Sequence, residues 1–235
     1  MKLRNYKRIL VKLSGEILQG EKSFGIDNSA IERISSELLE IHNDGIEIGI
    51  VVGGGNFFRG ASNQEMLRFS ADDIGMLATV QNSIALADKF REMNSIATIF
   101  TSRKIAEIGV VFNAEKAISE IESEAILIFA GGTGNPFFTT DTAAILRALE
   151  INADIVIKGT KVDGIYDKDP VKYSDANLIK RISFDDYISK NLKVMDLTAI
   201  SLAKEFHLPI KVFNIKNSGS IKKAICEENF GSIIS

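Results

Sequence analysis

The chain has 235 residues, of which 45% are hydrophobic and 25% are charged. Its 28 Lys and Arg against 31 Asp and Glu give a net charge of -3, which excludes a general attraction to nucleic acid or anionic membranes, so any phosphate site must be local. One cysteine excludes an intrachain disulfide, and no apolar run approaches the ~20 residues that span a bilayer. We therefore expect a cytoplasmic protein with neither a nucleic acid nor a membrane as partner.

Short apolar runs alternate with helical patterns along the chain. Strands are predicted at residues 8–13, 46–52, 96–101, 125–130, 154–158 and 210–214, with an extra hairpin strand at 178–182. A first helix is capped by Asp27 or Asn28 and ends at Gly45, and others are predicted at residues 72–93, 114–123, 140–151, 196–207 and 220–227. This alternation predicts an α/β fold, a three-layer αβα sandwich around a central, mainly parallel sheet. We expect a single domain, residues 1–235, with approximate lobes at 1–150 and 151–235.

Two glycine-rich turns, at residues 53–60 and 131–141, each follow an apolar strand. A third turn follows Lys12 at Ser14-Gly15. The carboxyl ends of parallel strands meet at one edge of a sheet, where such folds bind ligands. Glycine lets backbone N–H groups approach an anion closely. These turns therefore predict a site for several phosphates.

Common nucleotide and metal motifs are absent from the sequence. Gly20 and Gly25 have Walker spacing, but Ile26 stands where the lysine of a P-loop must be. The glycine turns also lack the third glycine of a dinucleotide fingerprint, because Phe58 and Phe137 occupy that position. The two histidines, His42 and His207, are too isolated to form a metal cluster, and Cys226 is expected to be a buried hydrophobe rather than a nucleophile.

Three charged residues have the positions that phosphoryl transfer requires. Lys12 and Lys158 end the first and fifth predicted strands, and Asp141 opens the helix after the second glycine turn. Transfer of a phosphoryl group needs fixed positive charge and a group that orients it. Taken singly, each has an ordinary explanation, since strand-end lysines are often solvated and an acidic residue in a first helical turn is favoured by the helix dipole. Together with the glycine turns, they favour a catalytic site.

Several segments resemble the bacterial uridylate kinases of the amino acid kinase superfamily. They are residues 12–15, 53–60, 75–79, 132–141, 161–166 with Asp169-Pro170, and 194–197. The resemblance covers nearly the whole chain, and the sequence Thr-Gly-Asn-Pro-Phe-Phe-Thr-Thr-Asp at 133–141 is the most specific part of it. It implies an amino acid kinase-like fold and transfer of the γ-phosphoryl of MgATP to UMP, with Mg²⁺ bound mainly through the nucleotide phosphates and no metal site on the protein.

The resemblance also implies roles for individual residues. The implied catalytic residues are Lys12, Asp141 and Lys158. The residues implied to bind ATP are Lys12, Leu13, Ser14, Gly15, Gly55, Arg59, Thr160, Tyr166 and Asp169. The residues implied to bind UMP are Gly54, Asp72, Thr133, Gly134, Asn135, Pro136, Phe137, Phe138, Thr139 and Thr140. An allosteric GTP region corresponds to Gly20, Glu21, Lys22, Ser23, Phe24 and Gly25, for which an ordinary loop is an equal alternative.

Some assignments stay open at this point. Asp73 could replace Asp72 at the ribose, because the preceding segment is about two residues shorter than in the family. Phe137 and Phe138 could shape the acceptor pocket or belong to the core, and Asp196 is assigned only as a helix cap.

The resemblance further implies a homo-oligomer, a hexamer of three dimers, with GTP activation and UTP inhibition. The helical segments 31–41 and 74–90 support an oligomer, since they carry more apolar residues than one sheet face needs, and the alternative is that both are buried within one subunit. The alternatives are another kinase of the superfamily, with a carboxylate, carbamate or phosphonate acceptor, and a non-catalytic nucleotide- or anion-binding protein on the same fold.

Overall fold

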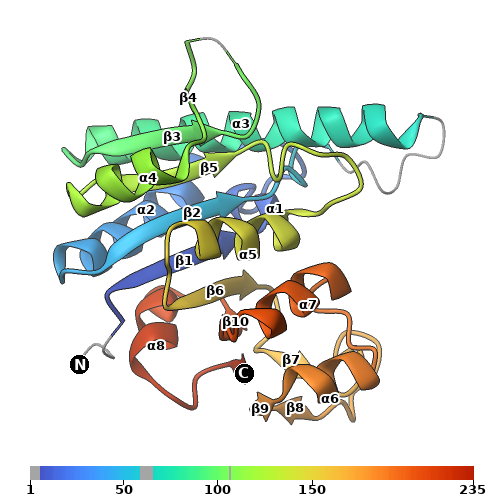
Figure 1. Ribbon diagram of the computed structural model, residues 1–235. Helices are drawn as coiled ribbons and strands as arrows, with labels where there is room; N and C mark the ends of the chain where they lie inside the picture. The colour runs from blue at the N-terminus through green and yellow to red at the C-terminus, as the bar shows by residue number, and fades with distance from the viewer. Residues whose placement is uncertain (1–5, 59–65, 106) are drawn as a thin grey trace.

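A nine-stranded sheet in the order β4-β3-β5-β2-β1-β6-β10-β11-β9 forms the centre of the computed structural model, which describes residues 6–58, 66–105 and 107–235 (Figure 1). Its strands are β1 (Arg8–Leu13), β2 (Glu47–Val52), β3 (Ala97–Thr101), β4 (Val110–Val111), β5 (Ile126–Ala130), β6 (Ile155–Thr160), β9 (Arg181–Ile182), β10 (Ile210–Asn214) and β11 (Ser232–Ile234). A separate hairpin joins β7 (Ile165–Tyr166) to β8 (Leu178–Ile179). The helices are α1 (Gly15–Leu18), α2 (Asn28–Asn43), α3 (Arg68–Glu92), α4 (Ala114–Glu122), α5 (Thr140–Glu150), α6 (Phe184–Ser189), α7 (Leu197–Glu205) and α8 (Ser220–Cys226).

Side chains of the central strands alternate between two cores, one on each face of the sheet. Ile9 and Val11 of β1 pack with apolar residues of α2, α3 and α8, whereas Leu10 packs with those of α4, α5 and α7. This alternation follows from the strand period of two and buries both faces of the sheet. The predicted three-layer α/β sandwich is therefore confirmed.

The sheet is mainly parallel, as predicted. Strand β1 pairs in parallel with β2 on one side and with β6 on the other, and only β11 runs antiparallel to its neighbour β10 among the described pairs of this sheet. The carboxyl ends of the parallel strands therefore share one edge, and the register there places Lys12 directly opposite Lys158.

Two sequence predictions about elements need correction. Residues 178–182 form two short strands in different sheets rather than one strand, because β8 pairs with β7 and β9 pairs with β11. The apolar residues of α2 do not support an oligomer, since Ile31, Ile34 and Leu38 are all buried within this chain. Helix α3 differs, with Leu77 and Ile84 exposed.

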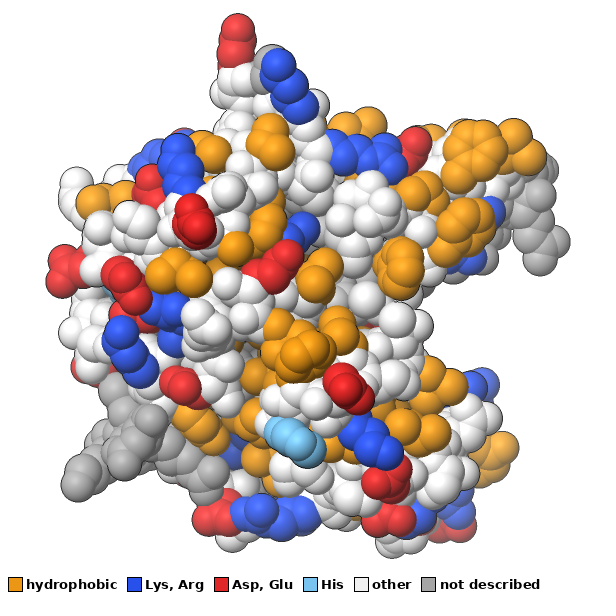
Figure 2. Space-filling view, viewed as in Figure 1, with side chains coloured by type: hydrophobic (Ala, Val, Ile, Leu, Met, Phe, Trp, Pro, Cys, Tyr) orange, Lys and Arg blue, Asp and Glu red, His pale blue; other side chains and the backbone are white. Residues whose placement is uncertain are grey.

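The surface in Figure 2 carries charges of both signs, and it is hollowed between the projecting end of α3 and the part that contains α6 and α7. Within the described ranges, no helix is both long and apolar enough to cross a membrane.

Candidate active site

Lys12, Asp141 and Lys158 form a buried ion cluster at the carboxyl edge of the sheet. Lys12 Nζ lies 2.7 Å from Asp141 Oδ1, and Lys158 Nζ lies 2.6 Å from Asp141 Oδ2. Both lysine side chains are 9% exposed. Strand register brings the two lysines together, and the first turn of α5 places the carboxylate between them. One carboxylate thus fixes two ammonium groups, each through its own oxygen.

Burial and charge act against each other in this cluster. Burial disfavours the ionised form of Asp141, but the charges of Lys12 and Lys158 outweigh it and lower the pKa of Asp141 to about 2. Burial, followed by the positive charge of Lys12, lowers the pKa of Lys158 to about 8 despite the attraction of Asp141. Asp141 is therefore a carboxylate at neutral pH, and the Lys158 ammonium loses its proton at a lower pH than an ordinary lysine does.

The segment that follows α6 supplies a second acceptor for Lys158. Lys158 Nζ donates a hydrogen bond to the Val194 carbonyl. The buried Tyr187 hydroxyl fixes the next residue, because it accepts from Met195 N at 2.7 Å and lies 3.2 Å from Met195 O. The Lys158 ammonium therefore has two fixed acceptors and a defined direction.

Asp196 does more than cap a helix. Its carboxylate accepts from Ala199 N at 2.7 Å, which is the predicted cap of α7. It also accepts from the Thr139 hydroxyl and, at 3.1 Å, from the Thr142 hydroxyl. Asp196 thus ties the start of α5 to α7, beside the ion cluster.

The glycine turns after β1 and β2 are packed against each other. A Cβ on Gly15 would lie 2.6 Å from the Gly53 carbonyl oxygen and 2.8 Å from Gly55 N. A Cβ on Gly54 would lie 2.7 Å from the Cβ of Ala78 in α3. Real Cβ atoms do not approach so closely, so only glycine allows these backbones to meet. Ser14, Gly15 and Gly55 are thereby brought together next to Lys12. Arg59 lies outside the described residues.

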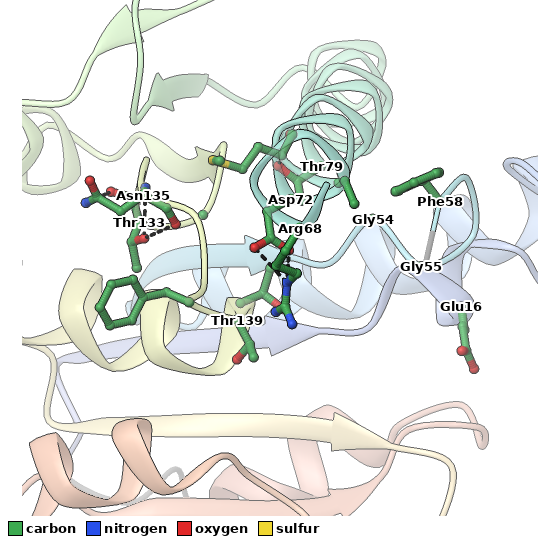
Figure 3. A pocket seen from close by; sticks show the side chains of 16 residues that line it. Glu16, Gly54, Gly55, Phe58, Arg68, Asp72, Thr79, Thr133, Asn135 and Thr139 are labelled. Carbon is green, nitrogen blue, oxygen red and sulfur yellow. Dashed lines mark hydrogen bonds and ion pairs between the residues drawn. The ribbon is translucent and has the colours of Figure 1, made fainter. Parts of the chain in front are cut away.

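A cavity of about 390 Å³ opens between these turns, α3 and the turn after β5. Figure 3 shows the side chains around it. Of the residues expected at UMP, those that line it are Gly54, Asp72, Thr133, Asn135, Phe138, Thr139 and Thr140. Gly134, Pro136 and Phe137 are expected there but do not line it.

Asp72, rather than Asp73, belongs to this cavity. Both oxygens of Asp72 lie 2.9 Å from Arg68 Nε, and Oδ2 also accepts from Phe137 N at 2.7 Å (Figure 3). Asp73 instead pairs with Arg103, with 2.8 Å between Oδ1 and Nη1. The two neighbouring carboxylates thus have different partners, and only Asp72 lines the cavity.

Comparison with known proteins places this architecture in a family. The sequence model of the amino acid kinase family matches residues 7–214. The chain belongs to the amino acid kinase family. A uridylate kinase from Buchnera aphidicola is 46% identical over 232 residues, covering 97% of this chain and 96% of the relative. A uridylate kinase from Bacteroides thetaiotaomicron is 47% identical over 234 residues, covering 99% of each chain. The crystal structure of UMP kinase from Bacillus anthracis superposes with a TM-score of 0.95 at 34% identity, covering 99% of this chain and 97% of the other.

In this amino acid kinase, Phe137 and Phe138 are not part of the core. They are 68% and 48% exposed, so the alternative of two core aromatics is wrong. Phe137 has a backbone φ of 72°, a left-handed conformation that is unusual for a bulky residue. In this conformation the backbone N–H of Phe137 donates a hydrogen bond to the carboxylate of Asp72.

A second cavity, of about 490 Å³, lies beside the β7–β8 hairpin. Tyr166 and Asp169 line it, as expected for the ATP nucleoside site, whereas Thr160 lies at the end of β6 and does not. Asp169 also accepts from Val171 N at 2.9 Å, a contact that stabilises the turn at Asp169-Pro170. Lysines surround this cavity: Lys168, Lys172, Lys190 and Lys193. None of these four lysines belongs to a sequence motif that predicts nucleotide binding.

The loop at residues 20–25 is hydrogen-bonded to the glycine turn that follows β2. Gly25 N donates to Asn56 O at 3.0 Å, and Asn56 Nδ2 donates to Gly25 O at 2.8 Å. Phe24 packs edge-on against Phe57, with 5.5 Å between the ring centroids. Lys22 Nζ, however, donates to Ile26 O at 2.8 Å. The loop therefore contacts the Gly53–Gly55 turn through Asn56 and Phe57 rather than through its cation.

Several cavity residues of this amino acid kinase were missed in the sequence, notably Glu16, Arg68 and Thr79. Arg68 carries a signal, because it lies four residues before Asp72 and such pairs meet on one helix face. Thr79 has no such signal, since its partner is distant: its hydroxyl accepts from Gly131 N at 2.7 Å. Only the fold brings these residues together.

In the described residues, no three His, Cys, Asp or Glu side chains lie together as metal ligands would. Cys226 is partly buried, and burial raises the pKa of its thiol, which disfavours the thiolate.

Proposed function

We propose that this amino acid kinase transfers the γ-phosphoryl group of ATP to UMP, giving ADP and UDP. The observation that carries the proposal is the buried cluster of Lys12, Asp141 and Lys158, which lies beside the glycine turns and a cavity with the expected acceptor residues. Relatives named uridylate kinase, 46% and 47% identical over nearly the full chain, support UMP as the acceptor. Since both nucleotides are intracellular metabolites, we place the enzyme in the cytoplasm.

The chemical step is a direct transfer without a covalent enzyme intermediate. An oxygen of the UMP phosphate attacks the γ-phosphorus, the bond from that phosphorus to the bridging oxygen breaks, and ADP leaves with the electron pair. Lys12 and Lys158 lie on either side of the transferred group and stabilise the charge on its oxygens. Asp141 keeps both ammonium groups in place before the reaction begins, so little reorganisation is needed in the transition state.

Substrate placement follows from the two cavities. UMP occupies the cavity between α3 and the turn after β5, with Asp72 accepting from the ribose hydroxyls. The ATP nucleoside occupies the cavity beside the β7–β8 hairpin, with Tyr166 near the base, and its phosphates lie over Ser14, Gly15 and Gly55. This assignment makes residues 1–150 the acceptor lobe and 151–235 the lobe of the ATP nucleoside.

Mg²⁺ accompanies the nucleotide in this proposal. Kinase families transfer phosphoryl groups from nucleotides, usually with Mg²⁺. The carboxylate nearest the transferred group is Asp141, and both of its oxygens already contact lysines. Such an arrangement fits a metal ion held through the phosphates, where it neutralises their charge.

A panel of acceptors tests the proposal. ADP formation from MgATP should be fast with UMP and much slower with CMP, dUMP and AMP in a coupled assay. Turnover with a carboxylate, carbamate or phosphonate acceptor, and not with UMP, would instead identify another kinase of the family. Absence of ADP with every acceptor, together with nucleotide binding by calorimetry, would identify a non-catalytic binding protein.

The finer regulatory assignment is also a proposal. We expect a hexamer of three dimers that GTP activates and UTP inhibits. The hydrogen bonds between Gly25 and Asn56 support a role for the loop at residues 20–25, because they link it to the glycine turn after β2, where we expect ATP phosphates. GTP should change the UMP kinetics of the wild type and have a smaller effect on Lys22→Ala. Kinetics that ignore GTP, or a variant that responds like the wild type, would contradict this role.

A further inference from the structure

The turn after β5 has open space beside it as well as in front of it. Gly132 and Thr133 line the acceptor cavity, whereas Gly131 lines a separate cavity of about 280 Å³ between α3 and the segment after β3. A turn with hollows next to it is not fixed by close packing. Its position must depend largely on hydrogen bonds.

Ser102 and Arg103, directly after β3, supply such bonds. Ser102 Oγ donates to the Gly131 carbonyl at 2.6 Å, and Arg103 Nε donates to the Gly134 carbonyl at 2.7 Å. Gly134 has a φ of 83°, and a Cβ there would lie 3.2 Å from the carbonyl oxygen of Ser102. These two bonds attach the turn to the end of β3, and the positive charge of Arg103 strengthens its bond to the Gly134 carbonyl.

Arg103 also connects the turn to α3. Its Nη1 lies 2.8 Å from Asp73 Oδ1, next in sequence to Asp72. Helix α3 thus holds the turn at three places: directly, through Phe137 N on Asp72 and Gly131 N on the Thr79 hydroxyl, and indirectly, through Asp73, Arg103 and the Gly134 carbonyl. Thr133 and Asn135, which line the acceptor cavity, lie between or next to these attachments.

We propose that Arg103 is a positioning residue for the acceptor, which fixes the turn at residues 131–137 relative to Asp72 and so sets both the affinity for UMP and the preference for its base. The inference rests on the proposed function, since it assigns the same cavity to UMP. Arg103 does not touch the substrate. Its effect is to hold the polar groups of Thr133 and Asn135 at a constant distance from the carboxylate that accepts from the ribose.

Arg103→Ala and its controls test this role. We expect the KM for UMP to rise about 10-fold, a modest change for a charge-assisted bond because the side chain is about half exposed. The ratio of CMP to UMP turnover should rise as well, while the KM for ATP and the melting temperature stay close to those of the wild type. Asp73→Asn, which keeps the bond to Gly134, should show a smaller change in the same direction, and Arg103→Lys should restore part of the affinity.

Lys104→Ala is the matched control, because Lys104 is an exposed cation adjacent to Arg103. It should behave like the wild type. An unchanged KM for UMP in Arg103→Ala would overturn the inference, and so would equal losses for UMP and ATP with a lowered melting temperature, which would mark a merely structural residue. A wild type that does not phosphorylate UMP would overturn the proposed function itself, and this inference with it.

Discussion

At the scale of single residues, the position of Asp141 is fixed by two ion pairs. Its two oxygens contact two different ammonium groups, and its pKa is lowered to about 2 even though burial opposes ionisation. The negative charge of Asp141 is therefore required for the two lysines to remain close together.

Asp141→Asn should reduce kcat about 100-fold or more, because the lysines lose the charge that orients them for the transition state. Binding of ATP and UMP should persist, since the glycine turns and the acceptor cavity are unaltered. Steady-state kinetics and calorimetry measure the two effects. Asp154→Asn is the control, a carboxylate at the opposite edge of the sheet that accepts from Arg8 N at 2.9 Å. Wild-type turnover in Asp141→Asn would remove this residue from the mechanism.

Lys158 should give the reaction an alkaline limit. Its pKa is lowered from 10.5 to about 8, so its positive charge is lost as the pH rises through about 8 in the free enzyme. We expect kcat/KM for ATP to fall above that pH. In Lys158→Arg the charge persists, so any remaining activity should lack this decline. The same decline in both proteins would assign it to another group.

The lowered pKa of Lys158 affects the stability of the fold in the opposite direction from its effect on activity. Between about pH 8 and pH 10.5 the unfolded chain holds the Lys158 proton that the folded chain has released. The contribution of this residue to the free energy of unfolding therefore rises with pH over that window, while activity falls.

The sequence predicted the residues of the ion cluster because each lies at the end of a clear strand or at the start of a clear helix. It could not predict their partners. The contacts of Lys158 with Val194 O, and of Asp196 with Thr139, join segments that are far apart in the chain. Sequence periodicity contains no information about which loops meet above a sheet.

At the scale of elements, α3 acts as a wall of the acceptor cavity against which the β2 turn is pressed. A methyl group on Gly54 would lie 2.8 Å from the Gly75 carbonyl oxygen and 3.2 Å from Thr79 N. Both are backbone atoms, so they cannot move aside as a flexible side chain would.

Gly54→Ala should therefore displace the turn from α3, raise the KM for UMP and lower the free energy of unfolding by about 1–3 kcal/mol. Gly75→Ala provides the matched control for stability. Among the described residues, nothing apart from its chain neighbours and the backbone of its own helix lies within 4 Å of a Cβ built at Gly75, so alanine should increase stability by about 0.5–1 kcal/mol. Urea unfolding measures both, and equal stability of the two variants would contradict the close packing of the turn.

Long elements were predicted well and short ones were not. Strands β1, β2, β3, β5, β6 and β10 carry mostly apolar runs of five or six residues, and α2 has both a cap and an apolar face. In contrast, α1, β4, β7 and β11 have between two and four residues each, too few to show a period. Their positions depend on tertiary contacts. For α1, this contact is the close approach of Gly15 to Gly53.

At the scale of the whole molecule, α3 presents an exposed apolar face. Leu77 is 54% exposed and Ile84 is 41% exposed, one above the other at a spacing of two helical turns. In an assembled protein this face would be covered.

Light scattering at micromolar concentration should give a mass near six times 25.8 kDa. Leu77→Glu combined with Ile84→Glu should reduce this mass, because buried carboxylates would oppose association. Val171→Glu, at an exposed position in the loop after β7, is the control and should leave the mass unchanged. A wild type of 25.8 kDa would exclude the assembly.

The central place of β1 has a consequence for the newly made protein. Strand β1 can pair with β2, and β2 with β5 and β3, once the residues up to Ala130 have left the ribosome. The other edge of β1 stays unpaired until β6, which begins at Ile155, has also been released. During that interval an apolar strand has an open edge, and only Arg8 and Lys12 on it carry charge. Charges on an open edge oppose pairing with another chain. Arg8 and Lys12 should therefore oppose pairing of this open edge with another chain, and for Lys12 this would be a role separate from its contact with Asp141.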